Sequence, residues 1–174
     1  MKKQDLPDSP SNPPPQPIDV MRQTFRDLEL KFEEDERQIK SRVILQNVEV
    51  LVLSWGALDD VAQLMVHLPI RAAKPVRLKV GEFLHRLNFH AKRKFWEMDF
   101  DDGEVRMAVH TDTTIGPLTP QHFGGILHLM LNTADTVFPY ITNVLSGAMS
   151  AELAADQALA AVQNFSNSEP ADED

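Results

Sequence analysis

The histidines are the residues of this sequence best suited to bind a metal ion or to transfer a proton. There are six of them: His67, His85, His90, His110, His122 and His128. No two are four residues apart, and none belongs to an HExxH motif, so the helix-borne pair that typically holds zinc is missing. A site that the fold assembles from distant histidines stays open, but the local spacing does not predict a metal centre.

Nucleophilic catalysis also lacks its usual local signatures. The chain has no cysteine, which excludes a thiol nucleophile, disulfides and thiolate metal sites. Ser54, Ser146 and Ser150 lie in no nucleophile-elbow or SxxK context. The seven glycines form neither a GxGxxG motif nor a phosphate-binding loop. We therefore expect a protein that is not an enzyme and that uses no cofactor.

Four acidic residues, Asp99, Asp101, Asp102 and Glu104, cluster in a short segment and could suggest a calcium loop. An EF-hand loop counted from Asp99 needs glycine at its sixth position and glutamate at its twelfth. Those positions hold Glu104 and His110 instead, so the pattern fails. Asp and Glu around a glycine are ordinary turn residues, and we interpret the cluster as a hairpin turn.

The charge of the chain is unevenly distributed. The formal net charge is −9, but residues 71–94 hold eight basic residues and one acidic residue, for a balance of +7. Residues 1–70 carry −4 and residues 95–174 carry −12. A mildly acidic protein is usually expected to avoid anionic partners, and this segment makes that expectation unsafe.

The basic segment supplies most of the candidate partner-binding residues. Arg77, Lys79 and Arg86 lie on or near a predicted helix, and Lys92, Arg93 and Lys94 follow it in a loop. Such a block is commonly a solvated face, here paired in part with the acidic C-terminal third. The functional interpretation is docking of an acidic protein segment or of a nucleic-acid backbone. Nucleic acid is the weaker of the two because no RNP-type aromatic motif or helix-turn-helix accompanies the charges.

The two tryptophans complete the candidate set. Trp55 lies at a predicted loop and Trp96 in a predicted hairpin, so core or dimer contacts explain both. If they are instead exposed on a sheet, they suggest a groove for an extended peptide.

The elements that would position these residues follow from apolar spacing. Asp19 fits a helix N-cap, and Met21, Phe25, Leu28 and Phe32 predict an amphipathic helix of about four turns. Three strands are predicted next, at about 39–45, 48–53 and 63–68. Gln46-Asn47 would be the tight turn between the first two, and residues 55–60 a longer turn before the third. A helix should follow over about 76–87.

The clearest local pattern is a hairpin over residues 95–109. A two-residue type I′ turn at Asp102-Gly103 would place Asp99 opposite Arg106 on one face. The other face would then hold three apolar pairs: Phe100 with Val105, Met98 with Met107, and Trp96 with Val109.

A long apolar stripe predicts a helix over 120–147. Thr119-Pro120 fits its start and Gly147 its end, while Pro139 should kink or split it near Asp135. Ser150 should cap a last helix that ends near Phe165. The order α-β-β-β-α-β-β-α, plus a final helix, defines an α+β class with an antiparallel sheet and helices packed on one side.

The domain organisation is simple. Six prolines in residues 1–17 predict a disordered tail, for which a proline-binding-module ligand is the functional alternative. Residues 18–165 should form one domain, and 166–174 an acidic disordered tail. The start has no apolar stretch after its lysines, and no run approaches the roughly 20 residues of a membrane helix. We expect a cytoplasmic protein without a membrane partner.

Several spaced motifs resemble the YbjN family. The stretch Leu87-Asn88, then residues 95–99 and 102–106, is similar to its "LN … FELD … DGEVR" passage. Asp135, residues 138–140, Gly147 and Ser150-Ala151 are similar to its "D … YxP … G … SP" helix ending, so the resemblance covers roughly residues 20–163. The sequence departs from the family at Lys94, where many relatives have glycine, and at Pro139, which precedes Tyr140.

The resemblance implies a fold like that of type III secretion chaperones, often dimeric, and a role described as bacterial sensory-transduction regulation. Together with the missing catalytic groups, it leads us to expect a chaperone-like or regulatory protein-binding module that acts as a homodimer. Such a module would hold an extended or helical segment of another protein. A regulator that binds nucleic acid or an acidic partner through residues 71–94 is the alternative.

Overall fold

The computed structural model describes residues 15–58, 60–91 and 96–168. Within them the chain forms an α+β fold whose six strands make one antiparallel sheet, in the order β1-β2-β3-β4-β6-β5. The strands are β1 (Phe32–Glu34), β2 (Gln38–Ile44), β3 (Glu49–Leu58), β4 (Val61–Arg71), β5 (Trp96–Met98) and β6 (Glu104–Asp112). The predicted fold class is thereby confirmed, with one short strand, β1, in addition.

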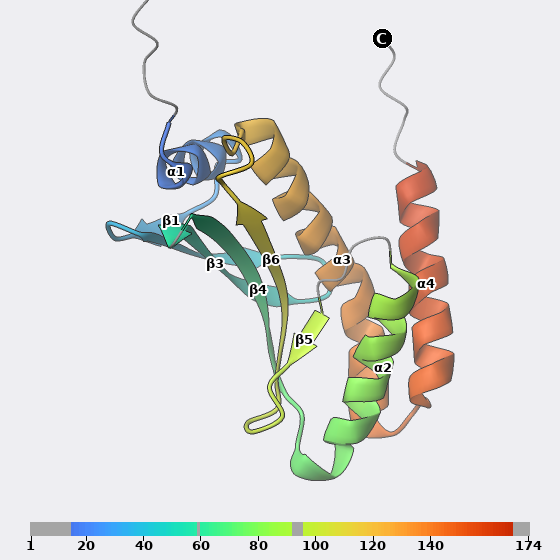
Figure 1. Ribbon diagram of the computed structural model, residues 1–174. Helices are drawn as coiled ribbons and strands as arrows, with labels where there is room; N and C mark the ends of the chain where they lie inside the picture. The colour runs from blue at the N-terminus through green and yellow to red at the C-terminus, as the bar shows by residue number, and fades with distance from the viewer. Residues whose placement is uncertain (1–14, 59, 92–95, 169–174) are drawn as a thin grey trace, which may run out of the picture.

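The helices cover one face of this sheet (Figure 1). They are α1 (Pro17–Asp27), α2 (Arg77–His90), α3 (Pro120–Ser146) and α4 (Ala151–Ser168), with a 3₁₀ turn η1 (Lys74–Val76) before α2. Strand β4 shows how the layer is built, because its burial alternates as a strand with one covered face requires. Ala62, Leu64, Val66 and Leu68 point into the core.

Helix α3 is the long central element of the helical layer. Its predicted stripe from Phe123 to Val144 is buried, with Leu127, Met130 and Ile141 fully so. Thr119 caps it by accepting the His122 N–H, and Gly147 ends it with a φ of 78°. The predicted split near Asp135 was wrong, because the helix runs through Pro139 without interruption; the kink that was predicted as the alternative stays a prediction.

The first helix is shorter than predicted. It ends at Asp27, and Glu29 takes a left-handed φ of 54°, so Phe32 begins strand β1 instead of completing the helical stripe. The mistake has a physical reason, because the Phe32 ring still packs on Phe25, at 5.7 Å between centroids. Asp19 is not the N-cap; Gln16 holds that position and Pro17 opens the helix.

The turn at Gln46-Asn47 is confirmed, since Ile44 pairs with Glu49 on either side of it. The longer turn predicted over residues 55–60 was wrong, because β3 continues to Leu58. Gly56 is what allows the strand to continue beneath α1: a Cβ there would lie 2.6 Å from the Cβ of Ile18.

The predicted hairpin exists, but its register differs by two residues. Arg106 pairs with Glu97 instead of Asp99, and Trp96 pairs with Met107. The loop is four residues long, because the Gly103 N–H donates to the Asp99 carbonyl and the Asp99 N–H to the Glu104 carbonyl. A slip of two residues keeps every side chain on its predicted face, which is why the apolar pattern alone could not reveal it.

Candidate protein-binding surfaces

The helices of the described residues leave one face of the sheet uncovered (Figure 1), and we call it the open sheet face. Its centre is an apolar lane made of Leu51, Leu53 and Trp55 on β3, with Met65 on β4 opposite Leu53. All four side chains are half-buried, whereas their neighbours in sequence, such as Val52 and Val66, are fully buried in the core. Alternation along a strand thus gives this protein two apolar sheet faces, and only one of them is covered by helices.

Basic side chains border the lane on both sides. On β2, Lys40 lies opposite Leu53 and Arg42 opposite Leu51. On β6, Arg106 and His110 take the corresponding positions beside β4.

At the end of β6, hydrogen bonds from the hydroxyl and the backbone N–H of Thr114 lower the pKa of Asp112.

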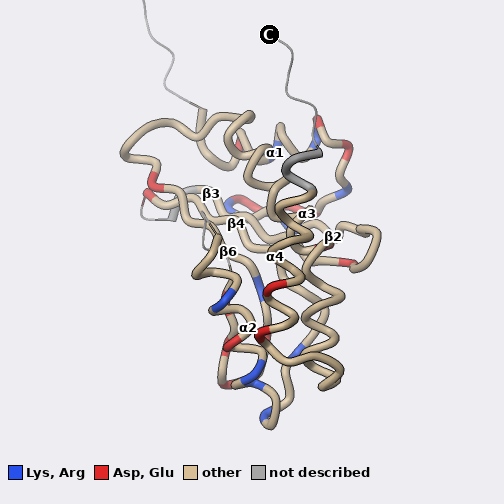
Figure 2. Tube along the Cα trace, turned by 90° about the vertical axis from the view of Figure 1, so that its right-hand side faces the viewer, with Lys and Arg blue, Asp and Glu red and all other residues tan. Residues whose placement is uncertain are grey.

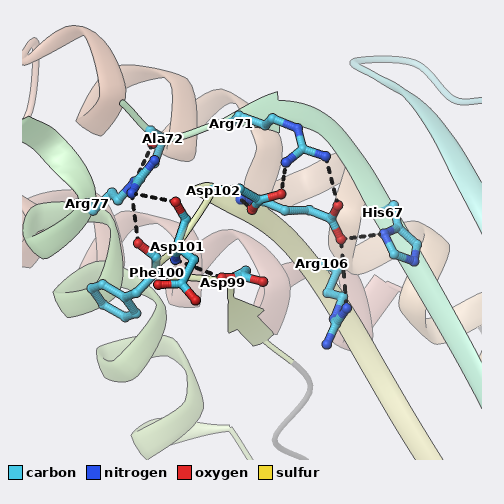
Figure 3. Close-up of polar contacts among 10 residues, drawn as sticks. His67, Arg71, Ala72, Arg77, Asp99, Phe100, Asp101, Asp102 and Arg106 are labelled. Carbon is cyan, nitrogen blue, oxygen red and sulfur yellow. Dashed lines mark hydrogen bonds and ion pairs between the residues drawn. The ribbon is translucent and has the colours of Figure 1, made fainter. Parts of the chain in front are cut away.

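A charged cluster occupies one end of this face (Figure 3). His67 Nδ1 lies 2.9 Å from Glu104 Oε1, and Arg71 Nη2 donates to Glu104 Oε2 at 3.2 Å. Arg106 reaches the same carboxylate at 3.8 Å and also pairs with Glu97 at 3.0 Å. The Nε2 atom of His67 is buried and has no hydrogen-bond partner among the described residues.

Next to the cluster, an irregularity in β4 between His67 and Arg71 accompanies a hollow of about 510 Å³. A histidine held by a carboxylate is the orienting half of a catalytic triad, so the hollow was a candidate active site. The described residues that line it include no serine, threonine or cysteine to act as nucleophile: they are Arg42, Glu49, Val50, Leu51, His67, Leu68, Pro69, Ile70, Arg71 and Glu104. Within the described residues, no group of three or more His, Cys, Asp or Glu side chains could hold a metal ion.

Sequence reasoning missed this hollow because its residues come from four strands. The only local sign was the alternation of polar side chains, His67 with Arg71 on one strand and Glu104 with Arg106 on another. Such alternation is equally typical of any solvated sheet face.

The described arginines of the basic segment, Arg71, Arg77 and Arg86, have partners inside the molecule. Arg77 donates to the carbonyls of Ala72 at 2.9 Å, Phe100 at 2.7 Å and Asp101 at 3.1 Å. Arg77 therefore ties the β5–β6 loop to the start of α2. The aspartates of that loop serve the turn, since Asp99 accepts the Asp101 N–H and Asp102 accepts the Glu104 N–H.

The other members of the segment are placed differently. Arg86 pairs with Glu82 at 2.9 Å and with Glu152 of α4 at 3.6 Å, while Lys79 is exposed. Figure 2 shows acidic positions interspersed with the basic ones around α2. Lys92, Arg93 and Lys94 lie outside the described residues.

The structure separates the two tryptophans. Trp55 lies on the open sheet face, but Trp96 is on the covered side with only 7% of its surface exposed. The side chain of Asn88 fixes the Trp96 backbone, accepting its N–H at 3.1 Å and donating to its carbonyl at 2.8 Å.

Helix α2 also exposes two large apolar side chains that sequence reasoning missed. Val80, Phe83, Leu84 and Leu87 are buried beneath it, as the predicted spacing requires. On the opposite side, Leu78 is 79% exposed and Phe89 is 71% exposed. The signal was available, because two large apolar residues fall outside the phase of the buried stripe.

No family model matches the chain, and no curated protein matches it. The chain is similar to a solved structure described as "Crystal structure of YbjN, a putative transcription regulator from E. coli". The identity is 14%, the TM-score is 0.46, and the match covers 75% of this chain and 90% of that chain. The protein so found bears the name of the family that the sequence motifs resemble.

The described helices were compared with the length and hydropathy of transmembrane helices. None of the helices among the described residues combines the length and the hydropathy that a transmembrane span requires.

Proposed function

We propose that this chain is a non-enzymatic protein-binding module, acting as a homodimer, that holds an extended segment of a partner protein on its open sheet face. One observation carries the proposal: the half-buried apolar lane of Leu51, Leu53, Trp55 and Met65 on a sheet face without helices. Apolar sheet faces are normally buried, and one left open is typical of a surface that meets another molecule.

The side chains around the lane indicate which residue types the bound segment of the partner protein would carry. Exposed Lys40 and Arg42 border it on β2, and Arg106 borders it on β6. A partner with alternating apolar side chains and acidic residues at its flanks would match both the lane and its borders. Charges at a rim act chiefly on the rate and selectivity of association, while the buried apolar contacts supply affinity.

A regulatory role is compatible with this chemistry, because a module that captures a segment of another protein can control that protein's availability. Arg77, Lys79, Arg86 and Lys92–Lys94 are then residues that steer association over a distance. Since Arg77 and Arg86 already have partners inside the molecule, Lys79 is the described member with the most freedom to do so.

The proposal is tested by binding the full chain to an array of immobilised extended peptides that differ in apolar alternation and charge. We expect wild-type binding to peptides with alternating apolar and acidic residues, and a loss of about tenfold or more in the Leu53→Lys variant. Leu28→Lys is the matched control, because Leu28 is also exposed but lies at the end of α1. Equal binding by Leu53→Lys and wild type would overturn the proposal.

A further inference from the structure

Helix α2 has a buried apolar side and exposes two large apolar residues on the opposite side. Its buried side packs on the core of its own chain, and its outer side presents a line of four residues: Leu78, Glu82, His85 and Phe89. At 100° per residue, this outer line points directly away from the buried one. Two large apolar side chains aligned on one exposed helix face make the outer line a candidate surface for a partner.

The spacing of the outer line restricts what that partner can be. Its steps of four, three and four residues are those of the seam between two packed helices. The order apolar, acidic, imidazole, apolar is also self-complementary. If two copies of α2 pack antiparallel about a two-fold axis near residues 83–84, Leu78 of each copy faces Phe89 of the other. Glu82 of each copy then faces His85 of the other.

Other arrangements of two copies match less well. Parallel packing places Glu82 on Glu82 and His85 on His85, so that like groups meet. An antiparallel shift by one heptad leaves Leu78 or Phe89 without an apolar counterpart. Only the symmetric antiparallel register satisfies all four positions, and a two-fold interface requires that kind of self-complementarity.

The surroundings of the line permit such packing. A hollow of about 380 Å³ lies along it, lined by Glu82, His85, Arg86, Phe89 and His90. Arg86 stands at its edge, but its charge is already compensated by Glu82 and by Glu152 of α4. The basic character of α2 therefore opposes the approach of a second α2 less than its sequence suggests.

We propose that a second copy of this chain covers the outer face of α2, with the two α2 helices antiparallel and Leu78 against the other copy's Phe89. This inference rests on the homodimer of the proposed function and names its contact surface. The open sheet face stays free in such a dimer and available to a partner segment.

The absence of cysteine from the natural sequence makes a positional test direct. Leu78→Cys and Phe89→Cys are made as separate full-length variants with different tags, and each is treated with a short bismaleimide alone and after mixing. We expect a cross-linked dimer in the mixture and little in either variant alone. In the proposed register, two copies of residue 78 lie roughly 16 Å apart along the helix axis.

A second pair of variants tests the same register without cross-linking. Leu78→Glu and Phe89→Lys should each weaken self-association by roughly a hundredfold. Mixing them should restore a heterodimer, because the new acid then faces the new base while Phe89 of the first faces Leu78 of the second.

The outcomes separate this inference from the homodimer itself. A dimer in sedimentation that shows neither the mixed cross-link nor the charge rescue would overturn the α2 interface and leave the homodimer standing. A strong cross-link in Leu78→Cys alone would overturn the antiparallel register. A chain that stays monomeric at every concentration would overturn the interface together with the homodimer.

Discussion

The open sheet face and the outer face of α2 are both uncovered, but they leave their apolar residues in different conditions. On the sheet, Leu51, Leu53, Trp55 and Met65 shelter one another and are only half-exposed. On α2, Leu78 and Phe89 stand apart from each other with more than two thirds of their surface in water.

This difference indicates different occupants. A sheet face whose side chains already support each other can exist without a ligand, which suits a segment that binds and leaves. Isolated large apolar side chains gain more from permanent cover, and the α2 line is self-complementary. The comparison therefore agrees with both proposals, an exchangeable partner on the sheet and a second copy of the chain on α2.

The largest effect is expected between the two regions in the chain, at the contact between Gly103 of the β5–β6 loop and Ala72, which follows β4. The Ala72 N–H donates to the Gly103 carbonyl at 2.7 Å, and a Cβ on Gly103 would lie 2.0 Å from the Ala72 oxygen. Gly103 also has a φ of 82°, which favours glycine. Gly103→Ala should lower the free energy of unfolding by about 3 kcal/mol or more, as measured by urea denaturation.

Gly116→Ala is the matched control for this prediction, because a Cβ at Gly116 would meet nothing within 4 Å. Its stability should stay within about 0.5 kcal/mol of wild type. If Gly103→Ala behaves like Gly116→Ala, the contact with Ala72 does not hold the β5–β6 loop against the end of β4.

We expect that a mutation can disrupt peptide binding on the open sheet face without disrupting self-association through α2. Leu53→Lys should reduce the affinity for a bound peptide by about tenfold or more while leaving self-association unchanged. Peptide titration followed by Trp55 fluorescence gives the first quantity, and sedimentation gives the second. A parallel loss of both would show that the two surfaces are one.

An effect on stability smaller than that of Gly103→Ala is expected at Arg77, which ties the β5–β6 loop to α2. Arg77→Met removes hydrogen bonds to three carbonyl oxygens and should cost about 2 kcal/mol of stability, measured by thermal unfolding. Lys79→Met, two residues away on the exposed side, should leave the melting temperature nearly unchanged. Equal losses in the two variants would mean that Arg77 is no more structural than Lys79.

The smallest effect concerns the nucleic-acid alternative. Because the arginines of α2 are used internally, we expect only weak binding of DNA or RNA fragments by the full chain, even at low salt. Lys92→Glu combined with Arg93→Glu should then change little in a fluorescence-anisotropy titration. Tight, salt-dependent binding that this double variant abolishes would favour the alternative over a protein partner.

The sequence was most informative where pattern and packing act on the same residues. The stripe of α3, its Thr119 cap and its Gly147 end were all predicted, because each depends on residues close together in the chain. The hairpin was predicted with the correct faces but the wrong register, because the long-range bonds of Arg77 to Phe100 and Asp101 stabilise a four-residue loop.

The candidate site was harder to predict. The lane on the sheet joins β3 and β4 through strand register, and the hollow beside it depends on an irregularity at Pro69 that no local pattern indicates. The charges of residues 71–94 were visible at once, but their partners Glu104, Asp102 and Glu152 are distant in sequence. The sequence therefore predicted partial pairing of this block with the acidic C-terminal third, but not which residues form the pairs.

The central claim, a homodimer joined through α2 with a free sheet face, is tested most directly by sedimentation equilibrium at several protein concentrations. The account predicts a mass of twice the 19.6 kDa chain for wild type and for Leu53→Lys. It predicts a single chain mass for Leu78→Glu combined with Phe89→Glu. A wild-type protein that sediments as a single chain at tens of micromolar, or a Leu78→Glu, Phe89→Glu variant that stays dimeric, would contradict it.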